Sequence, residues 1–211
     1  MINFLYFNLF LVMTDSFTLK VHEYFVSNLR AFPVTLSLYS FVGGILFNNP
    51  AYIVFGIYIT LCDMLISHPL KLLSKAIYKG LNTETIPILG RGPRPVGAKY
   101  CGCFITESNL NGVSKSFGMP SGHSITAASM FAFWFLYFQE HTQDLKLRRR
   151  QQVILGLICA AVIISRIYLG CHTIQQTIVG GLIGGGLGIL GYKFFYKQAL
   201  YYIKYYNLLN F

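Results

Sequence analysis

The sequence predicts an all-α fold, a polytopic membrane helix bundle with five to six transmembrane helices, from three observations. Of the 211 residues 54% are apolar and only 11% are charged, whereas a soluble domain carries about 25% charged residues. Long apolar stretches recur along the chain. The basic residues behind the net charge of +10 fall mainly between these stretches, as they do in membrane proteins. We therefore expect contact with membrane lipids and no nucleic-acid partner.

Five stretches approach the roughly 17–25 residues that cross a hydrocarbon core. Residues 1–13 are also apolar, but they lack the basic start and the small-residue cleavage site of a signal peptide. We expect them to form a short first span or to lie in the interface. The chain then divides into an N-terminal segment, 1–30, and one membrane domain, 31–211. The five expected spans cover 31–47, 51–67, 124–138, 153–169 and 177–195.

The connections between the spans indicate the orientation. Asn49-Pro50 predicts a tight turn, and residues 68–120 form a long segment rich in Gly, Pro, Lys and Arg. Lys146 and the run 148–150 mark the loop before 153 as cytoplasmic. Because spans alternate in direction, the long segment, the start of the span at 124 and the turn after 169 should share the opposite face.

Two features at that face suit an anion. Pro120 and Ser121 immediately precede an apolar helix, so the N–H groups of Gly122 and His123 should be unpaired donors in its first turn. Arg166 ends the next span, with Gly170 as its expected C-terminal glycine. Taken alone, the first motif is also compatible with an ordinary helix start, and the second with an arginine that snorkels from the end of a span.

His172 follows that glycine, and Gln176 lies four residues further on. Residues with this spacing share a helical face. The Gln176 amide can therefore accept a hydrogen bond from Nδ1–H of the imidazole and leave Nε2 free to attack.

Together with Arg94-Pro95, these stretches resemble the signature of the type-2 phosphatidic-acid phosphatase (PAP2) superfamily. Its pattern is Lys-x6-Arg-Pro, Pro-Ser-Gly-His and Ser-Arg-x5-His-x3-Asp. The order of the motifs and their places between spans match over roughly residues 50–195. The resemblance implies a membrane enzyme that hydrolyses a phosphate or diphosphate ester of a lipid.

The resemblance also implies a role for each matching residue. His172 would be the nucleophile that forms a phosphohistidine, and His123 would protonate the leaving oxygen. Phosphoryl transfer depends mainly on positioning and charge stabilisation, which two arginines and backbone amides can supply. We therefore expect no metal and no cofactor. The groups that would bind the phosphate are Arg94, Arg166, Ser121 and Gly122.

Two positions depart from the family pattern. Pro87 stands where the lysine is expected, and we consider Arg91 the nearest substitute, ahead of Lys75, Lys79 and Lys99. Gln176 stands where the family has aspartate. A neutral amide can orient an imidazole but stabilises an imidazolium less well than a carboxylate does, so we expect Gln176→Asp to preserve or raise activity.

The stretch 172–176, His-Thr-Ile-Gln-Gln, resembles the dolichyl-diphosphate phosphatases and favours a polyprenyl or dolichyl diphosphate over phosphatidate. That resemblance also suggests the endoplasmic reticulum, with the active site facing the lumen. A phosphotransferase of the same superfamily and a catalytically silent lipid-phosphate binder remain alternatives. The oligomeric state is left open.

Three cysteines, Cys101, Cys103 and Cys171, fall on the expected lumenal side, where oxidation can occur. A disulfide from Cys171 to the long segment would hold that segment beside His172.

Overall fold

The structure, a computed structural model, describes residues 2–99, 101–103, 114 and 116–206. It is mostly helical, and a short antiparallel hairpin pairs Thr85 with Arg91 and Ile86 with Gly90. The α-helices and strands are α1 (Ile2–Leu46), α2 (Pro50–Cys62), α3 (His68–Gly80), β1 (Thr85–Ile86), β2 (Gly90–Arg91), α4 (Gly122–His141), α5 (Leu145–Tyr168), α6 (Ile174–Leu190) and α7 (Lys197–Tyr205). Two π-helical turns, η1 (Asp63–Ser67) and η3 (Gly191–Tyr196), join α2 to α3 and α6 to α7.

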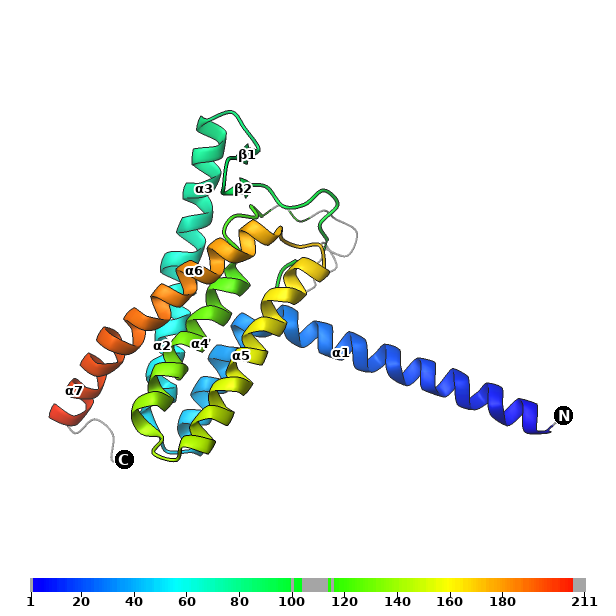
Figure 1. Cartoon of the computed structure of the whole chain (residues 1–211), viewed down its shortest axis with the longest axis horizontal. Coiled ribbons are helices and arrows are strands. Elements are labelled where there is room, and N and C mark those ends of the chain that lie inside the picture. The colour runs from blue at the N-terminus through cyan, green and yellow to red at the C-terminus, as the bar shows by residue number, and fades with distance from the viewer. Residues whose placement is uncertain (1, 100, 104–113, 115, 207–211) are drawn as a thin grey trace.

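Helix α4 lies inside the bundle, packed against α5 and α6, while α1 packs against α2 (Figure 1). Helix α1 bends where it meets the bundle, and its last part runs alongside the bundle (Figure 1). Pro33 lies inside α1, and a proline within a helix removes a hydrogen bond and is a common cause of a kink. The hairpin and the loops around it cap the bundle at the end opposite the α4–α5 turn (Figure 1).

The helices begin where the sequence supplies caps. Asn49 caps α2, with Pro50 as its first residue. Ser121 caps α4 and Asp144 caps α5, each through a side-chain oxygen that accepts backbone N–H. Thr173 and Gln176 form a capping box at the start of α6. These side chains satisfy donors that a helix start leaves unpaired.

Four helical stretches within the described residues are long and apolar enough to cross a membrane: Glu23–Leu46, Pro50–Gly80, Leu145–Tyr168 and Ile174–Tyr205. The expected count of five to six is therefore not confirmed. Helix α4, which contains the expected span 124–138, is not among them. Its polar residues Ser124, Thr126 and Ser129 are buried. These side chains make α4 less apolar, and the surrounding helices keep them away from lipid.

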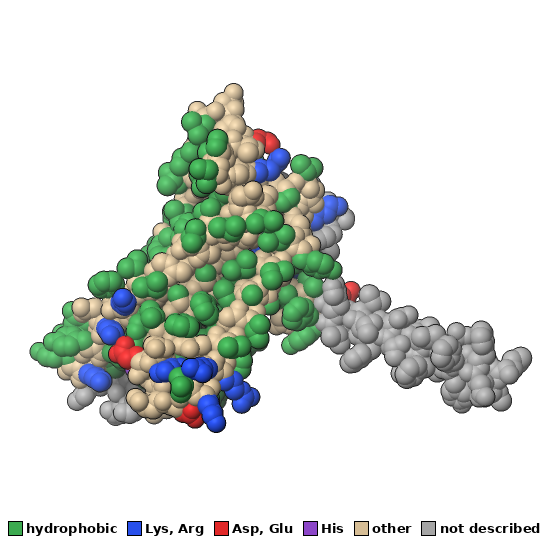
Figure 2. Space-filling model, viewed as in Figure 1, with side chains coloured by type: hydrophobic (Ala, Val, Ile, Leu, Met, Phe, Trp, Pro, Cys, Tyr) green, Lys and Arg blue, Asp and Glu red, His purple; other side chains and the backbone are tan. Residues whose placement is uncertain are grey.

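The outer surface fits a membrane environment. Hydrophobic side chains cover much of the visible flank of the bundle, and basic side chains gather where α4 turns into α5 (Figure 2). Leu157 and Leu182 are examples of exposed apolar residues on α5 and α6. Lys146, Arg149 and Arg150 are exposed in the first turns of α5.

One expected boundary differs from the structure. The segment expected to be a linker from residue 68 is helical up to Gly80, because α3 continues the span of α2. Lys71, Lys75 and Lys79 recur every fourth residue in α3. Their charges end the apolar stretch in the sequence without ending the helix. The expected division at residue 30 lies within α1 and stays a prediction.

Helices α4 and α6 approach each other closely along small residues. A Cβ at Gly184 would collide with the Ile125 backbone, and one at Gly188 would collide with Ser129. The Ser129 hydroxyl donates to the Gly184 carbonyl at 2.9 Å. Lipid is as apolar as a side chain, so close packing and such hydrogen bonds drive helix association in a membrane.

We predict that Gly184→Ala lowers stability by about 1–3 kcal/mol, the usual cost of overpacking. Gly185→Ala is the matched control, because a Cβ there meets nothing within 4 Å and alanine favours a helix over glycine. Thermal unfolding of both variants in detergent checks this. Equal melting temperatures would contradict the close approach of α4 and α6.

Candidate active site

The turn between α5 and α6 presents His172. Gly170 adopts a positive φ of 63° after the end of α5, as expected for a C-terminal glycine. The backbone N–H groups of Cys171 and His172 both donate to the Arg166 carbonyl, at 3.0 and 3.1 Å. The turn therefore holds His172 directly beside the last turn of α5, where only 3% of the residue is exposed.

Gln176 connects this turn to the loop before Arg94. Its Oε1 lies 3.1 Å from Nδ1 of His172 and accepts the Thr173 N–H at 3.2 Å. Its Nε2 donates to the carbonyls of Arg91 and Pro93, both at 2.7 Å, with Gly92 at 3.3 Å. An aspartate could accept from His172 but could donate nothing to these carbonyls. From this geometry we expect Gln176→Asp to weaken the attachment of the loop before Arg94, an effect that the sequence did not predict.

Arg94 contacts His172 from the other side. Its Nη1 lies 3.0 Å from Nε2 of His172 and donates to the Cys171 carbonyl at 2.9 Å. Its Nη2 and Nε bond the Ser116 hydroxyl at 2.8 and 3.1 Å. An arginine can only donate, so Nε2 of His172 carries the lone pair. Nδ1 then carries the proton that is donated to Gln176.

Arg166 is fully buried and has unused hydrogen-bonding capacity. Its Nη2 donates to the Cys101 carbonyl at 3.4 Å, while Nε and Nη1 have no hydrogen-bond partner among the residues that the structure describes. Buried charged groups are normally paired, because an unmet donor costs about 1–3 kcal/mol or more. The orphaned donors therefore suit an anion.

A disulfide joins Cys101 to Cys171, whose Cα atoms lie 5.4 Å apart. The structure thereby confirms a bond from Cys171 to the long segment. The carbonyls of these two cysteines accept from Arg166 and Arg94 respectively. The disulfide consequently links the backbone acceptors that hold the two arginines.

His123 lies in the first turn of α4, and its Nε2 donates to the Arg30 carbonyl of α1 at 2.7 Å. The Ser121 side chain is fully buried and caps α4 by accepting from Ser124 N and Oγ. Gly122 leaves little room for a side chain, since a Cβ there would lie 3.1 Å from Ser67 Oγ.

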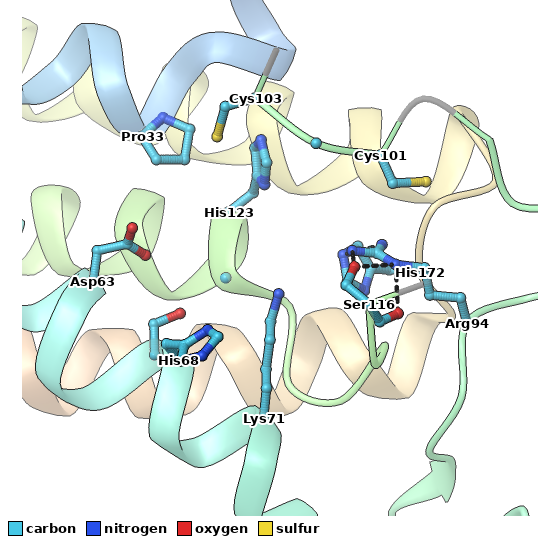
Figure 3. Close-up of a pocket in the computed structure, with 13 residues that line it drawn as sticks. Pro33, Asp63, His68, Lys71, Arg94, Cys101, Cys103, Ser116, His123 and His172 are labelled. Carbon is cyan, nitrogen blue, oxygen red and sulfur yellow. Dashed lines mark hydrogen bonds between the residues drawn. The ribbon is translucent and has the colours of Figure 1, made fainter. Parts of the chain in front are cut away.

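Arg94, Gly122, His123 and His172 line a cavity of about 210 Å³, whereas the predicted site residues Arg166, Ser121 and Gln176 do not line it (Figure 3). Arg94 and His172 lie at one end, Asp63 and His68 lie at the other, and His123 and Lys71 lie between them (Figure 3). Gly122 and Ser116 also line the cavity. Lys71, Asp63 and Ser116 were not predicted as site residues. For Lys71, the available signal was the four-residue lysine spacing that continues the span as α3.

Arg91, the predicted substitute for the lysine, does not line this cavity. Its guanidinium forms an ion pair with Glu84 at 2.8 Å in the loop that contains the hairpin. What Arg91 brings to the site is its backbone carbonyl, which accepts from Gln176. The side chain points to a local partner because β2 pairs with β1 and fixes the direction of the strand.

The electrostatics keep His172 neutral. Burial first, and then the charges of Arg94, Lys71 and Arg166, hold the pKa of His172 well below its ordinary value, against the hydrogen bond to Gln176. Burial also lowers the pKa of Arg94 to about 10, so the guanidinium stays charged at neutral pH. A neutral imidazole with its lone pair on Nε2 is the form that can act as a nucleophile.

Among the described residues, no group of three or more His, Cys, Asp or Glu side chains could hold a metal ion. The cavity offers arginine and lysine donors, which suit phosphoryl oxygens.

Comparison with known proteins identifies the family. The family model of the PAP2 superfamily matches residues 53–200. The chain belongs to the PAP2 superfamily. It is 34% identical to dolichyldiphosphatase 1 of Homo sapiens over 110 residues, which is 48% of this chain and 42% of that protein.

A second relative in the comparison is phosphatidylglycerophosphatase B of Bacillus subtilis (strain 168). It is 36% identical over 71 residues, or 33% of this chain and 35% of that protein. The PAP2 chain thus spans less than half the length of the curated relatives it matches. No solved structure matches it significantly.

We predict that Gln176→Glu in this PAP2 protein loosens the loop 91–94. The change keeps an oxygen for His172 but places a carboxylate against the carbonyls of Arg91 and Pro93, which costs about 1–3 kcal/mol. Gln175→Glu is the matched control, because Gln175 is exposed. Thermal unfolding in detergent measures both, and a Gln176→Glu protein as stable as the control would contradict the donor role.

We predict that peptide mapping without reductant finds Cys101 joined to Cys171. Cys62, Cys103 and Cys159 are expected as free thiols. Recovery of a Cys103–Cys171 peptide, or of Cys171 as a free thiol, would contradict the pairing.

Proposed function

We propose that this protein is an integral membrane lipid phosphatase. It hydrolyses a polyprenyl or dolichyl diphosphate, or a related lipid phosphate, through a phosphohistidine on His172. The supporting observation is the set of contacts on that imidazole. Gln176 accepts Nδ1–H, and the Nε2 lone pair faces Arg94 at the edge of a cationic cavity.

Substrate binding rearranges the donors around His172. A phosphoryl oxygen is a better acceptor for Arg94 than an imidazole nitrogen, because it is negatively charged. As the phosphoryl group enters, the Nη1–H of Arg94 turns from Nε2 of His172 and donates to a phosphate oxygen instead. The phosphate also offers acceptors to Nε and Nη1 of Arg166. Binding of the phosphoryl group therefore leaves the Nε2 lone pair of His172 free to attack phosphorus.

In the first chemical step Nε2 of His172 attacks phosphorus, and the bond from phosphorus to the leaving oxygen breaks. Burial first, and then the charge of Arg166, lower the pKa of His123 to about 3, against the hydrogen bond to the Arg30 carbonyl. The negative charge of the bound phosphate raises this pKa again, so that His123 takes up a proton on Nδ1 and gives it to the leaving oxygen. Arg94 and Arg166 stabilise the charge that develops on the equatorial oxygens. A single well-placed donor is worth about 3 kcal/mol in such a transition state.

In the second step a water molecule attacks the phosphohistidine. His123, now neutral, accepts a proton from the water. The phosphorus–nitrogen bond breaks, inorganic phosphate leaves and His172 returns to its neutral state. Each step uses groups that this chain supplies, so we expect catalysis that is independent of metal ions.

The choice of substrate rests on the relatives, whose printed names are dolichyldiphosphatase 1 and phosphatidylglycerophosphatase B. The proposed orientation places the site on the lumenal side of the endoplasmic reticulum. A disulfide beside His172 supports an oxidising compartment. The exposed basic residues at the start of α5, at the other end of the bundle, support a cytoplasmic turn there.

We predict that the detergent-purified protein releases inorganic phosphate from a polyprenyl diphosphate in the presence of EDTA. Removing the nucleophile by His172→Ala should lower the rate by a factor of at least about 1,000. His141→Ala is the matched control, since His141 is the last residue of α4 and stacks on Tyr137 far along the helix from the site.

A fully active His172→Ala protein would overturn the mechanism. No release by the folded wild-type protein from either a polyprenyl diphosphate or phosphatidate would favour a silent lipid-phosphate binder.

A further inference from the structure

Lys71 extends from α3 into the cavity (Figure 3). Its Nζ lies 3.7 Å from the position that a Cβ on Gly122 would occupy, at the first residue of α4. Within the described residues, the ion pairs are Arg91–Glu84 and Lys197–Glu140, and Lys71 belongs to neither. The ammonium therefore faces the start of α4 without an ion-pair partner.

This placement brings like charges together. A helix N-terminus carries about half a positive charge on its unpaired N–H groups, so an ammonium beside it is unfavourable unless an anion lies between them. Arg166 is also buried, and its Nε and Nη1 have no partner among the described residues. Arg166 does not line this cavity, but it donates to the carbonyl of Cys101, which does. The start of α4, Lys71 and Arg94 therefore give the cavity a positive lining that suits bound negative charge.

The cations form two groups. Arg94 contacts His172, Ser116 and the Cys171 carbonyl at one end of the cavity. Lys71 and the His123 side chain lie further along, between the Arg94 end and the Asp63 end (Figure 3). Gly122 lies next to the Lys71 ammonium. A phosphoryl group beside Nε2 of His172 lies at the Arg94 end, and the part of the ligand that continues along the cavity passes Lys71.

The direction of attack identifies that part. In a phosphoryl transfer the attacking atom and the leaving oxygen lie roughly in line, on opposite sides of phosphorus. When Nε2 of His172 attacks, the leaving oxygen therefore points away from His172, toward the rest of the cavity. In a diphosphate this oxygen carries the second phosphoryl group, whereas in a monophosphate it carries an apolar chain.

We propose that Lys71 binds the second phosphoryl group of a lipid diphosphate and gives the enzyme its preference for diphosphates over monophosphates. This inference rests on the proposed function and adds the residue that selects the substrate class. In the reaction His172 takes the terminal phosphoryl group, and the lipid monophosphate leaves with the proton from His123. The Lys71 ammonium stabilises the charge of that departing monophosphate.

Asp63 lies at the end of the cavity opposite Arg94, with Lys71 between them (Figure 3). Lys71 could therefore have another role, that of a partner for this carboxylate. The two roles make different predictions. A lysine that serves only Asp63 would affect both substrates alike, and Asp63→Asn would then reproduce the effect of removing Lys71.

The test compares a prenyl diphosphate with the corresponding prenyl monophosphate, using phosphate release by the full chain in detergent. Loss of a charge-assisted hydrogen bond is worth about 1.5–3 kcal/mol. Lys71→Met should therefore lower kcat/KM for the diphosphate about 10- to 100-fold and change the monophosphate less than about threefold. Lys79→Met is the matched control on the same helix, because Lys79 is exposed and does not line this cavity.

Lys71→Arg keeps the cation and should retain more of the diphosphate preference than Lys71→Met. It also keeps the test decisive if the methionine variant does not fold. Equal losses on both substrates, a preference unchanged in Lys71→Met, or the same shift in Asp63→Asn would overturn the inference. Absence of activity in the wild-type protein on both substrates would instead overturn the proposed function itself.

Discussion

The side chain of Gln176 makes the hydrogen bonds on which the geometry of the site depends. Its oxygen accepts from His172 and from the first turn of α6, and its nitrogen donates to three consecutive carbonyls before Arg94. One buried amide thus fixes the tautomer of the nucleophile and the position of the arginine loop together. A buried amide satisfied on both sides also fixes its own orientation, because rotating it would place like groups against each other.

The burial of cations at and beside the cavity is the second constraint. Arg94 is nearly buried and shares the cavity with Lys71, while Arg166 is fully buried and contacts the cavity-lining Cys101. The carbonyls of the disulfide-linked Cys101 and Cys171 accept from the two arginines, but two donors of Arg166 have no partner among the described residues. Groups arranged in this way are costly to bury without an anion, and they are already oriented when a phosphate arrives, so little reorganisation is required.

Several features could be predicted from the sequence because they depend on local chemistry. Gly170 ends α5 as expected, and a disulfide reaches Cys171 from the long segment. The structure brings Arg94, Gly122, His123 and His172 to one cavity. Other features depend on tertiary contacts. Arg91 pairs with Glu84 because a hairpin directs it there, and the donor role of Gln176 requires a loop more than 80 residues away. Lys71 was missed because a charged residue after an apolar stretch indicates the end of a span, whereas here the helix continues past it.

The central claim is that His172 carries the phosphoryl group between the two steps. The most direct test mixes the purified protein with a polyprenyl diphosphate whose terminal phosphorus is radioactive, stops the reaction within milliseconds in alkali and maps the labelled peptide. The account predicts a label that is stable to alkali, labile to acid and confined to the peptide containing His172, with none in the His172→Ala protein. Phosphate release without any protein-bound label, or a label on another residue, would contradict it.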